Sequence, residues 1–212
     1  MDPNSARPHP TDDALPVFAH LLHERTPGPV VAVYDAAGTT IEDISRIQVS
    51  WLPGQNAILR YRIDGSGGEL AGRRDLVATV GSIPEGAAVV AGPDGDVGLW
   101  VVPNDPLLPG LPSALHRPTV ARLLSDLGST AEVAGIRLRS YRPGRRAVVE
   151  VSAGGTSIFL KVVPPAEARG LHERHRHLTH SLPVPDSLGV SPDLGNVALR
   201  ALPGVDLRTI IR

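Results

Sequence analysis

One lysine is the clearest candidate for chemistry in this chain. Lys161 is the single lysine among 21 basic residues, so the other 20 are arginines. It lies in the apolar run IFLKVV (158–163). Lysine carries a compact charge on a flexible stem, whereas arginine carries a wide planar fork. We therefore interpret Lys161 as a position that needs an ammonium group, the alternative being chance retention of one lysine.

The charges are unevenly divided between the two halves of the chain. Residues 1–106 carry 7 Arg and 14 Asp or Glu, a net charge of −7, and residues 107–212 carry 14 basic and 8 acidic residues, a net charge of +6. A basic half favours an anionic ligand, although the asymmetry can also arise by chance. Nucleic acid is not the expected partner, because the chain has seven aromatic residues and no basic run interleaved with them.

Composition also restricts the class of protein. The chain has no cysteine, which excludes a disulfide framework. The polar N-terminus MDPNSARPHPTDD contains no apolar run that could act as a signal peptide, and no segment reaches the length needed to span a membrane. We therefore expect a soluble, cytoplasmic protein with no membrane partner.

Two familiar catalytic motifs are broken. A Walker A loop needs Gly-Lys-Ser/Thr, but Leu160 precedes Lys161 and Val162 follows it. The run His172-Glu173-Arg174-His175 begins like H-E-x-x-H, but Arg176 stands where the second histidine belongs. We expect no metal ligands here, with a pair of these histidines on a metal as the minor alternative.

The elements that would position Lys161 follow from hydrophobic periodicity in the second half. We expect a short helix, then strands of which the last carries Lys161, then a second helix and a hairpin before Pro203-Gly204. Their ranges are 118–127, 134–144, 147–152, 156–163, 166–180 and 188–202. The remainder, 203–212, should begin another turn or helix.

The first half has a similar order. We expect a disordered tail over 1–13, and a helix, strands and a hairpin whose turn is Asp94-Gly95. The expected helix is 14–24, the strands are 30–36, 43–54, 57–63 and 75–81, the hairpin is 86–102, and 104–112 is a linker.

The two halves form a degenerate repeat in sequence. SWLPGQNAILRY (50–61) corresponds to SYRPGRRAVVEV (140–151), and Thr79 falls opposite Lys161. The first copy lacks both the lysine and the helix 166–180. These observations predict an α+β protein with two related antiparallel-sheet subdomains, over 14–112 and 113–212.

The second half resembles the N-terminal lobe of the protein-kinase-like fold, and in detail the aminoglycoside phosphotransferase group of small-molecule kinases. The resemblance covers about 134–212 and depends on the order of four motifs, which are IFLKVV (158–163), EARGLHERHRHL (167–178), LPVP (182–185) and VALRALPGVDLR (197–208). It implies an ATP-binding lobe with one central helix. A cap before such a lobe is similar to bacterial maltokinase-like enzymes, without a residue-level match to their cap.

The resemblance implies roles for individual residues. Lys161 would contact the ATP phosphates, and a helix glutamate would orient it by an ion pair. Glu167 shares the expected inward face with Ala168 and Leu171, so we favour it over Glu173, which remains the alternative. Gly144, Arg145 and Arg146 would lie over the phosphates, although the G-x-G-x-x-G of protein kinases is absent. Leu199, Arg200 and Ala201 fall where the hinge strand contacts adenine through its backbone.

The catalytic half of this fold is not found in the sequence. It would supply an aspartate base and the ligands of Mg²⁺, and the resemblance ends just after the hinge. We therefore expect the N-terminal ATP-binding portion of a kinase that transfers the γ-phosphate to a hydroxyl of a sugar, aminoglycoside or metabolite. Such a portion should be inactive without a C-terminal lobe of the same longer chain. The rival interpretation is a non-catalytic, β-rich binding or scaffold module.

Overall fold

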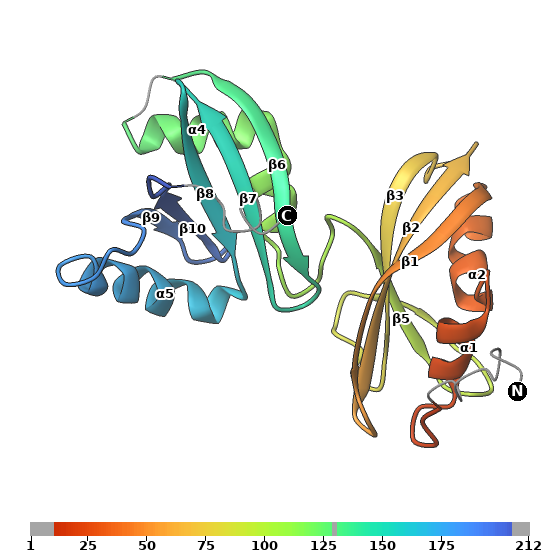
Figure 1. Cartoon of the computed structure of the whole chain (residues 1–212). Helices are drawn as coiled ribbons and strands as arrows, with labels where there is room; N and C mark the ends of the chain where they lie inside the picture. The colour runs from red at the N-terminus through yellow and green to blue at the C-terminus, as the bar shows by residue number, and fades with distance from the viewer. Residues whose placement is uncertain (1–10, 129–130, 205–212) are drawn as a thin grey trace, which may run out of the picture. The chain divides into compact units, whose positions relative to one another are not determined.

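The computed structural model of this chain describes residues 11–128 and 131–204. The chain divides into two compact units, Met1–Val102 and Pro103–Arg212, and each contains a five-stranded antiparallel sheet (Figure 1). The prediction of an α+β protein with two antiparallel sheets is confirmed. Within the described ranges, no helix is long and apolar enough to cross a membrane.

The two helices of the first unit pack against one face of its sheet. Its strand order is β1-β2-β3-β5-β4. The strands are β1 (Thr40–Leu52), β2 (Asn56–Ser66), β3 (Gly72–Val80), β4 (Ala88–Val90) and β5 (Val97–Val101). Side chains alternate along a strand, and Leu59, Tyr61 and Ile63 of β2 are buried in a core with helices α1 (Val17–His23) and α2 (Gly28–Ala36).

Helix α2 corrects a prediction, because the segment 30–36 was expected to be a strand. The valines of VVAVYDA favour a strand locally, but Pro29 lies in the first turn of α2, where its fixed φ suits a helix start. Val30 and Tyr34 are one turn apart and both are fully buried. Tertiary packing therefore overrides the β propensity of this segment.

The second unit repeats the sheet topology with the order β6-β7-β8-β10-β9. Its strands are β6 (Val133–Arg142), β7 (Arg146–Ala153), β8 (Thr156–Val162), β9 (Ser187–Ser191) and β10 (Asn196–Arg200). Its helices are α3 (Leu111–Leu115), α4 (Arg117–Asp126) and α5 (Pro165–Leu178). The sequence predicted these elements within a few residues, except for α3.

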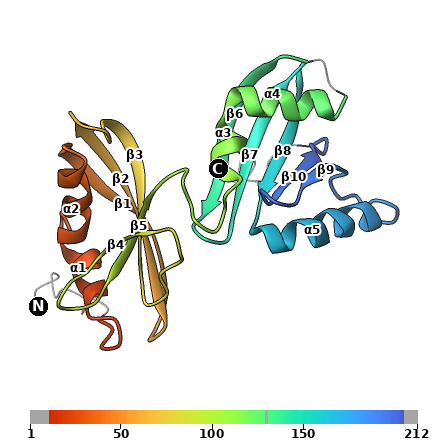
Figure 2. The same ribbon diagram turned by 180° about the vertical axis from the view of Figure 1, so that it is seen from behind.

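The two faces of the second sheet are covered differently. Leu160 of β8 lies against Ala114 and Val120 of α3 and α4, which cross one face of the strands in Figure 2. On the other face, Leu171 of α5 belongs to a core cluster with Val197 of β10. Helix α5 contacts β9 and β10, so none of the described helices covers the part of this face formed by β6 and β7, which we call the open part.

The boundary between the units lies earlier than the predicted linker. The chain divides between Val102 and Pro103, so the segment 104–112 belongs to the second unit. The reason is burial, because Leu108 and Leu111 are completely buried. The prolines and glycines of NDPLLPGLP suggested a linker, but the leucines between them form part of the core.

An aspartate holds the first hairpin of each unit. Oδ2 of Asp105 accepts the Tyr141 hydroxyl and the Gly144 amide, both at 2.7 Å. In the first unit, Oδ2 of Asp12 accepts the Trp51 indole N–H and the Gly54 amide, both at 2.8 Å. Residues 1–10 of the predicted tail lie outside the described residues, whereas Asp12 near its end is tied to the hairpin.

Candidate functional site

Lys161 lies on the open face of the second sheet. Because Leu160 faces α3 and α4, its neighbours Phe159 and Lys161 point to the opposite side. Lys161 pairs with Val148 of β7 on one side and Val197 of β10 on the other. The lysine therefore lies at the boundary between the part covered by α5 and the open part.

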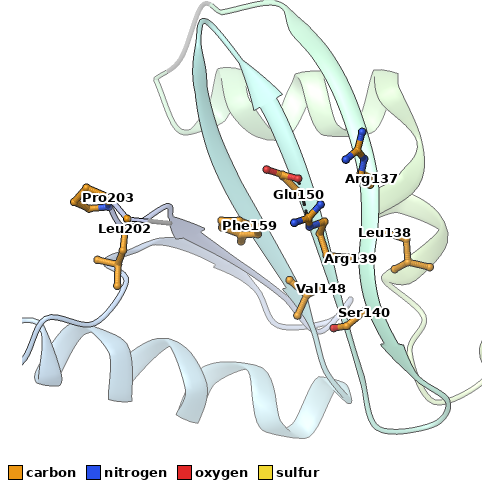
Figure 3. A pocket seen from close by; sticks show the side chains of 10 residues that line it. Arg137, Leu138, Arg139, Ser140, Val148, Glu150, Phe159, Leu202 and Pro203 are labelled. Atoms are coloured by element: carbon orange, nitrogen blue, oxygen red, sulfur yellow. Dashed lines mark ion pairs between the residues drawn. The ribbon is translucent and has the colours of Figure 1, made fainter. Parts of the chain in front are cut away.

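A hollow of about 890 Å³ opens on this face (Figure 3), and Lys161 is not one of the residues that line it. Its apolar lining includes Val148, Phe159 and Leu202, with Pro203 next to them at the exit from β10. Val148 is both a wall of the hollow and the cross-strand partner of Lys161. An apolar surface thus lies next to a cation on one sheet face, an arrangement suited to a ligand with a ring and an anionic group.

The rim of the hollow is mostly cationic. Arg137 and Arg139 come from β6, and Glu150 of β7 lies opposite Arg137 in the register. Figure 3 shows Arg139 directed at Glu150, with Nε to Oε2 at 3.6 Å. The other oxygen of Glu150 accepts the Ser157 hydroxyl at 3.3 Å. This carboxylate is therefore already engaged by two side chains.

The charge of Lys161 is disfavoured in the protein alone. Burial lowers the pKa of Lys161 below its usual range, and the positive charges of Arg146 and Arg174 lower that pKa further. Among the residues that the structure describes, Lys161 forms neither an ion pair nor a side-chain hydrogen bond. A half-buried ammonium without a carboxylate is well suited to receive an anion.

The predicted ion pair with a helix glutamate is not formed in this structure. Glu167 lies in the first turn of α5, but its side chain is exposed, and Glu173 is exposed as well. The inward positions of α5 are Ala168 and Leu171, both buried. Glu167 is the residue before the inward-facing Ala168. One residue turns an α-helix by about 100°, so the Glu167 side chain points away from the sheet.

The turn between β6 and β7 uses its backbone within the protein. Gly144 has φ of +67°, the left-handed region that suits glycine, and donates its amide to Asp105. The amide of Arg145 donates to the Arg142 carbonyl at 3.0 Å. The side chains of Arg145 and Arg146 are exposed, and Arg146 acts electrostatically on Lys161. The phosphate-contacting role of this turn remains a prediction.

The predicted hinge lies at the end of β10. Leu199 is buried against α5 rather than directed into the hollow. The Arg200 amide donates to the backbone carbonyl of Asp186 at 2.8 Å, and the Ala201 amide donates to the backbone carbonyl of Ser157 at 3.3 Å. The hollow is lined instead by the next residues, Leu202 and Pro203. The hinge role of all three residues stays a prediction.

Two histidines of α5 have structural partners. His172 Nδ1 lies 2.7 Å from the Ser187 hydroxyl, and His175 Nδ1 lies 2.8 Å from the Pro185 carbonyl. Both contacts attach α5 to the segment that leads into β9. In the described part of the chain, no group of three or more His, Cys, Asp or Glu side chains is arranged to hold a metal ion.

Comparison with protein-family models, with curated proteins and with solved structures finds no match to this chain.

The sequence motifs did not identify several residues of this face. They are Arg137, Arg139, Val148, Glu150, Phe159, Arg174, Leu202 and Pro203. Strand alternation could have identified Phe159, because it lies two residues before Lys161 and must share its face. Together with Lys161, these residues give the face an aromatic surface, apolar walls and a strong excess of positive charge.

Proposed function

We propose that the second unit is the ATP-binding portion of an aminoglycoside-phosphotransferase-like kinase, which transfers the γ-phosphate of ATP to a hydroxyl of a small molecule in the cytoplasm. The observation that carries this proposal is the position of Lys161. It is half-buried, lacks a carboxylate partner among the described residues, and pairs across the sheet with Val148, which lines a hollow with an aromatic wall. The order of elements also supports the proposal. Strands β6 and β7 are followed by β8, which carries Lys161, then by helix α5 and by strands β9 and β10, the order that the resemblance implies.

Each part of the face has a role in this proposal. The purine ring would lie against Phe159, Val148 and Leu202, which bury apolar surface without demanding one particular hydrogen-bond pattern. The phosphates would extend toward Lys161 and Arg146, whose positive charges would neutralise them. The negative charge of the phosphates would in turn favour the protonated form of Lys161, against the effect of Arg146.

The Mg²⁺ that accompanies ATP is expected to bind elsewhere. Glu150 is the carboxylate that lines the hollow, and Arg139 and Ser157 already engage it. The described residues of this face therefore do not offer the set of oxygen ligands that Mg²⁺ prefers. We propose that a C-terminal lobe of a longer chain supplies these ligands, the catalytic base and the acceptor site.

We infer further that the first unit is a duplicated sheet that serves as a cap. Its strand order equals that of the second unit, and Asp12 and Asp105 hold the equivalent hairpins with equivalent bonds. Thr79 pairs with Ile58 as Lys161 pairs with Val148. Thr79 is buried and donates to the Ser82 carbonyl, so the first unit has no cation at this position.

The test is ATP binding by the full chain, with backbone amide NMR and thermal unfolding as the two measurements. ATP should shift amide signals of β7, β8 and Leu202 and raise the unfolding midpoint, and Lys161→Ala should abolish both effects. Arg169→Ala, an exposed arginine on α5, is the control and should bind as the unchanged chain does. If ATP changes neither the spectrum nor the midpoint, the kinase assignment fails and the scaffold interpretation is favoured.

A further inference from the structure

Two of the cations on the open face are fixed by strand register. Lys161 on β8 lies directly opposite Val148 on β7. Arg146 is two residues before Val148 on the same strand and therefore lies on the same face, diagonal to Lys161. The two side chains are thus within reach of one ligand group.

A third cation comes from helix α5. Leu171 packs in one cluster with Val197, the partner of Lys161 on β10. Arg174 is three residues after Leu171, so it lies one turn further along the same side of the helix. Its charge acts on Lys161. Arg174 therefore lies on the flank of α5 next to Leu171, and its charge reaches Lys161, whereas no described ion pair joins Glu167 or Glu173 to the lysine.

These three charges repel one another in the protein alone. Among the described residues, no ion pair places a carboxylate on Arg146, Lys161 or Arg174. A ligand with several negative charges would relieve this repulsion at one point, and planar guanidinium groups can bind two phosphate oxygens at once. A polyphosphate has the required charge and length.

We propose that Arg174 of α5 completes a three-cation site with Arg146 and Lys161, and that this site binds the polyphosphate group of the ligand. The helix thus supplies an additional phosphate-binding residue where a lysine-orienting carboxylate was expected. This inference rests on the proposed function and deepens it, because it names a residue that sequence motifs did not identify.

The experiment is calorimetric titration of the full chain with ATP and, separately, with inorganic tripolyphosphate. Arg174→Ala should weaken the binding of both by about tenfold, the loss of one charged hydrogen-bonding partner. Arg176→Ala is the matched control, since Arg176 is an exposed arginine of the same helix that does not act on Lys161. It should change affinity less than about twofold. Arg174→Lys should bind more tightly than Arg174→Ala but more weakly than the unchanged chain, because lysine keeps the positive charge but lacks the planar guanidinium group.

A second readout detects the lysine directly. Because the bound anion favours protonated Lys161, tripolyphosphate binding at alkaline pH should take up protons, seen as a heat that depends on the ionisation enthalpy of the buffer. Lys161→Met should remove this uptake. Arg174→Ala should keep some uptake while lowering affinity.

The outcomes separate the inference from the proposed function. If Arg174→Ala and Arg176→Ala bind equally while Lys161→Ala loses ATP, the role of Arg174 is overturned and the ATP site stands. If tripolyphosphate depends on Arg174 but ATP binds no tighter than tripolyphosphate, the three-cation site stands and the nucleotide assignment fails. Absence of binding by both ligands overturns both.

Discussion

The carboxylate of Asp105 holds the amide of Gly144 at 2.7 Å, at the tip of the hairpin that leads into β7. The same oxygen accepts the Tyr141 hydroxyl. Asp105 is 3 % exposed, so water does not replace these bonds readily. The residue at the start of the second unit therefore fixes the hairpin beside the candidate site.

Asp105→Ala should lower the free energy of unfolding of the second unit by about 2–4 kcal/mol, because the Tyr141 hydroxyl and the amides of Gly144 and Leu107 all lose a charged acceptor. Urea denaturation followed by circular dichroism measures this change. Asp193→Ala, at an exposed turn position, is the control and should cost less than about 0.5 kcal/mol. Equal stabilities of the two variants would show that the bonds to Asp105 are energetically unimportant.

Lys161→Met should stabilise the unliganded chain, in contrast to its expected effect on ligand binding. The substitution removes a half-buried charge while keeping an unbranched apolar side chain. We expect the unfolding midpoint to rise by roughly 2 °C at neutral pH.

The pH dependence tests the same point. Because the folded-state pKa of Lys161 is below 10.5, the unfolded chain binds more protons between the folded pKa and 10.5. The unchanged protein should gain stability as pH rises through this window, and Lys161→Met should not gain it. A lower midpoint for Lys161→Met at neutral pH would contradict the interpretation.

Asp75 on β3 should support the first unit against acid. It pairs with Arg60 and with Arg62, whose Nε lies 3.0 Å from Oδ1. Burial alone would raise the pKa of Asp75, but the hydrogen bonds from Arg62 and Arg60 outweigh it and lower the pKa below 3.8. The contribution of Asp75 to the free energy of unfolding is therefore complete above pH 3.8 and is lost as pH falls through the folded-state pKa.

Asp75→Asn should accordingly cost about 1–3 kcal/mol at neutral pH. The difference from the unchanged protein should shrink in acid, as measured by urea denaturation over a series of pH values. A difference that stays constant down to strongly acidic pH would mean that the ion pairs are not its source.

His20 of α1 should give the first unit a second pH dependence. Nδ1 lies 2.8 Å from Glu24 Oε1 and Nε2 lies 3.1 Å from Asp94 Oδ2. The hydrogen bond with Glu24, followed by the charges of Glu24 and Asp94, raises the pKa of His20 above 6.5. The contribution of His20 to the free energy of unfolding is complete below pH 6.5 and is lost as pH rises through the folded-state pKa. NMR titration should show this pKa fall in Asp94→Asn, and an unchanged value would exclude the contact.

Most of the fold could be predicted from the sequence because its signals are local. The Asp94-Gly95 turn, the alternation in 57–63 and the amphipathic pattern of 166–180 each specify one element. Helix α2 was missed because its valines favour a strand, and only the burial of Val30 and Tyr34 against the sheet reveals the helix. The burial of Leu108 likewise could not be predicted, because the surrounding prolines and glycines indicate a linker.

The candidate site was less predictable, since it depends on register. The sequence identified Lys161 and Arg146, and strand alternation would have added Phe159. Arg139 lies at a register shift between Leu138 and Ser140, which no periodic pattern indicates. Arg174 could not be distinguished from Glu167 or Glu173 without knowing how α5 is rotated about its axis.

The hydrogen bonds to Asp105 also decide how the two halves can be produced separately. A recombinant second half that began at residue 113, the boundary suggested by the sequence, would lack Asp105, Leu108 and Leu111. It would lose the hydrogen bonds that Asp105 accepts from the Tyr141 hydroxyl and the Gly144 amide, together with two completely buried leucines of the core. Expression of this half for binding studies must therefore start no later than Pro103, and the first half must retain Asp12 for the same reason.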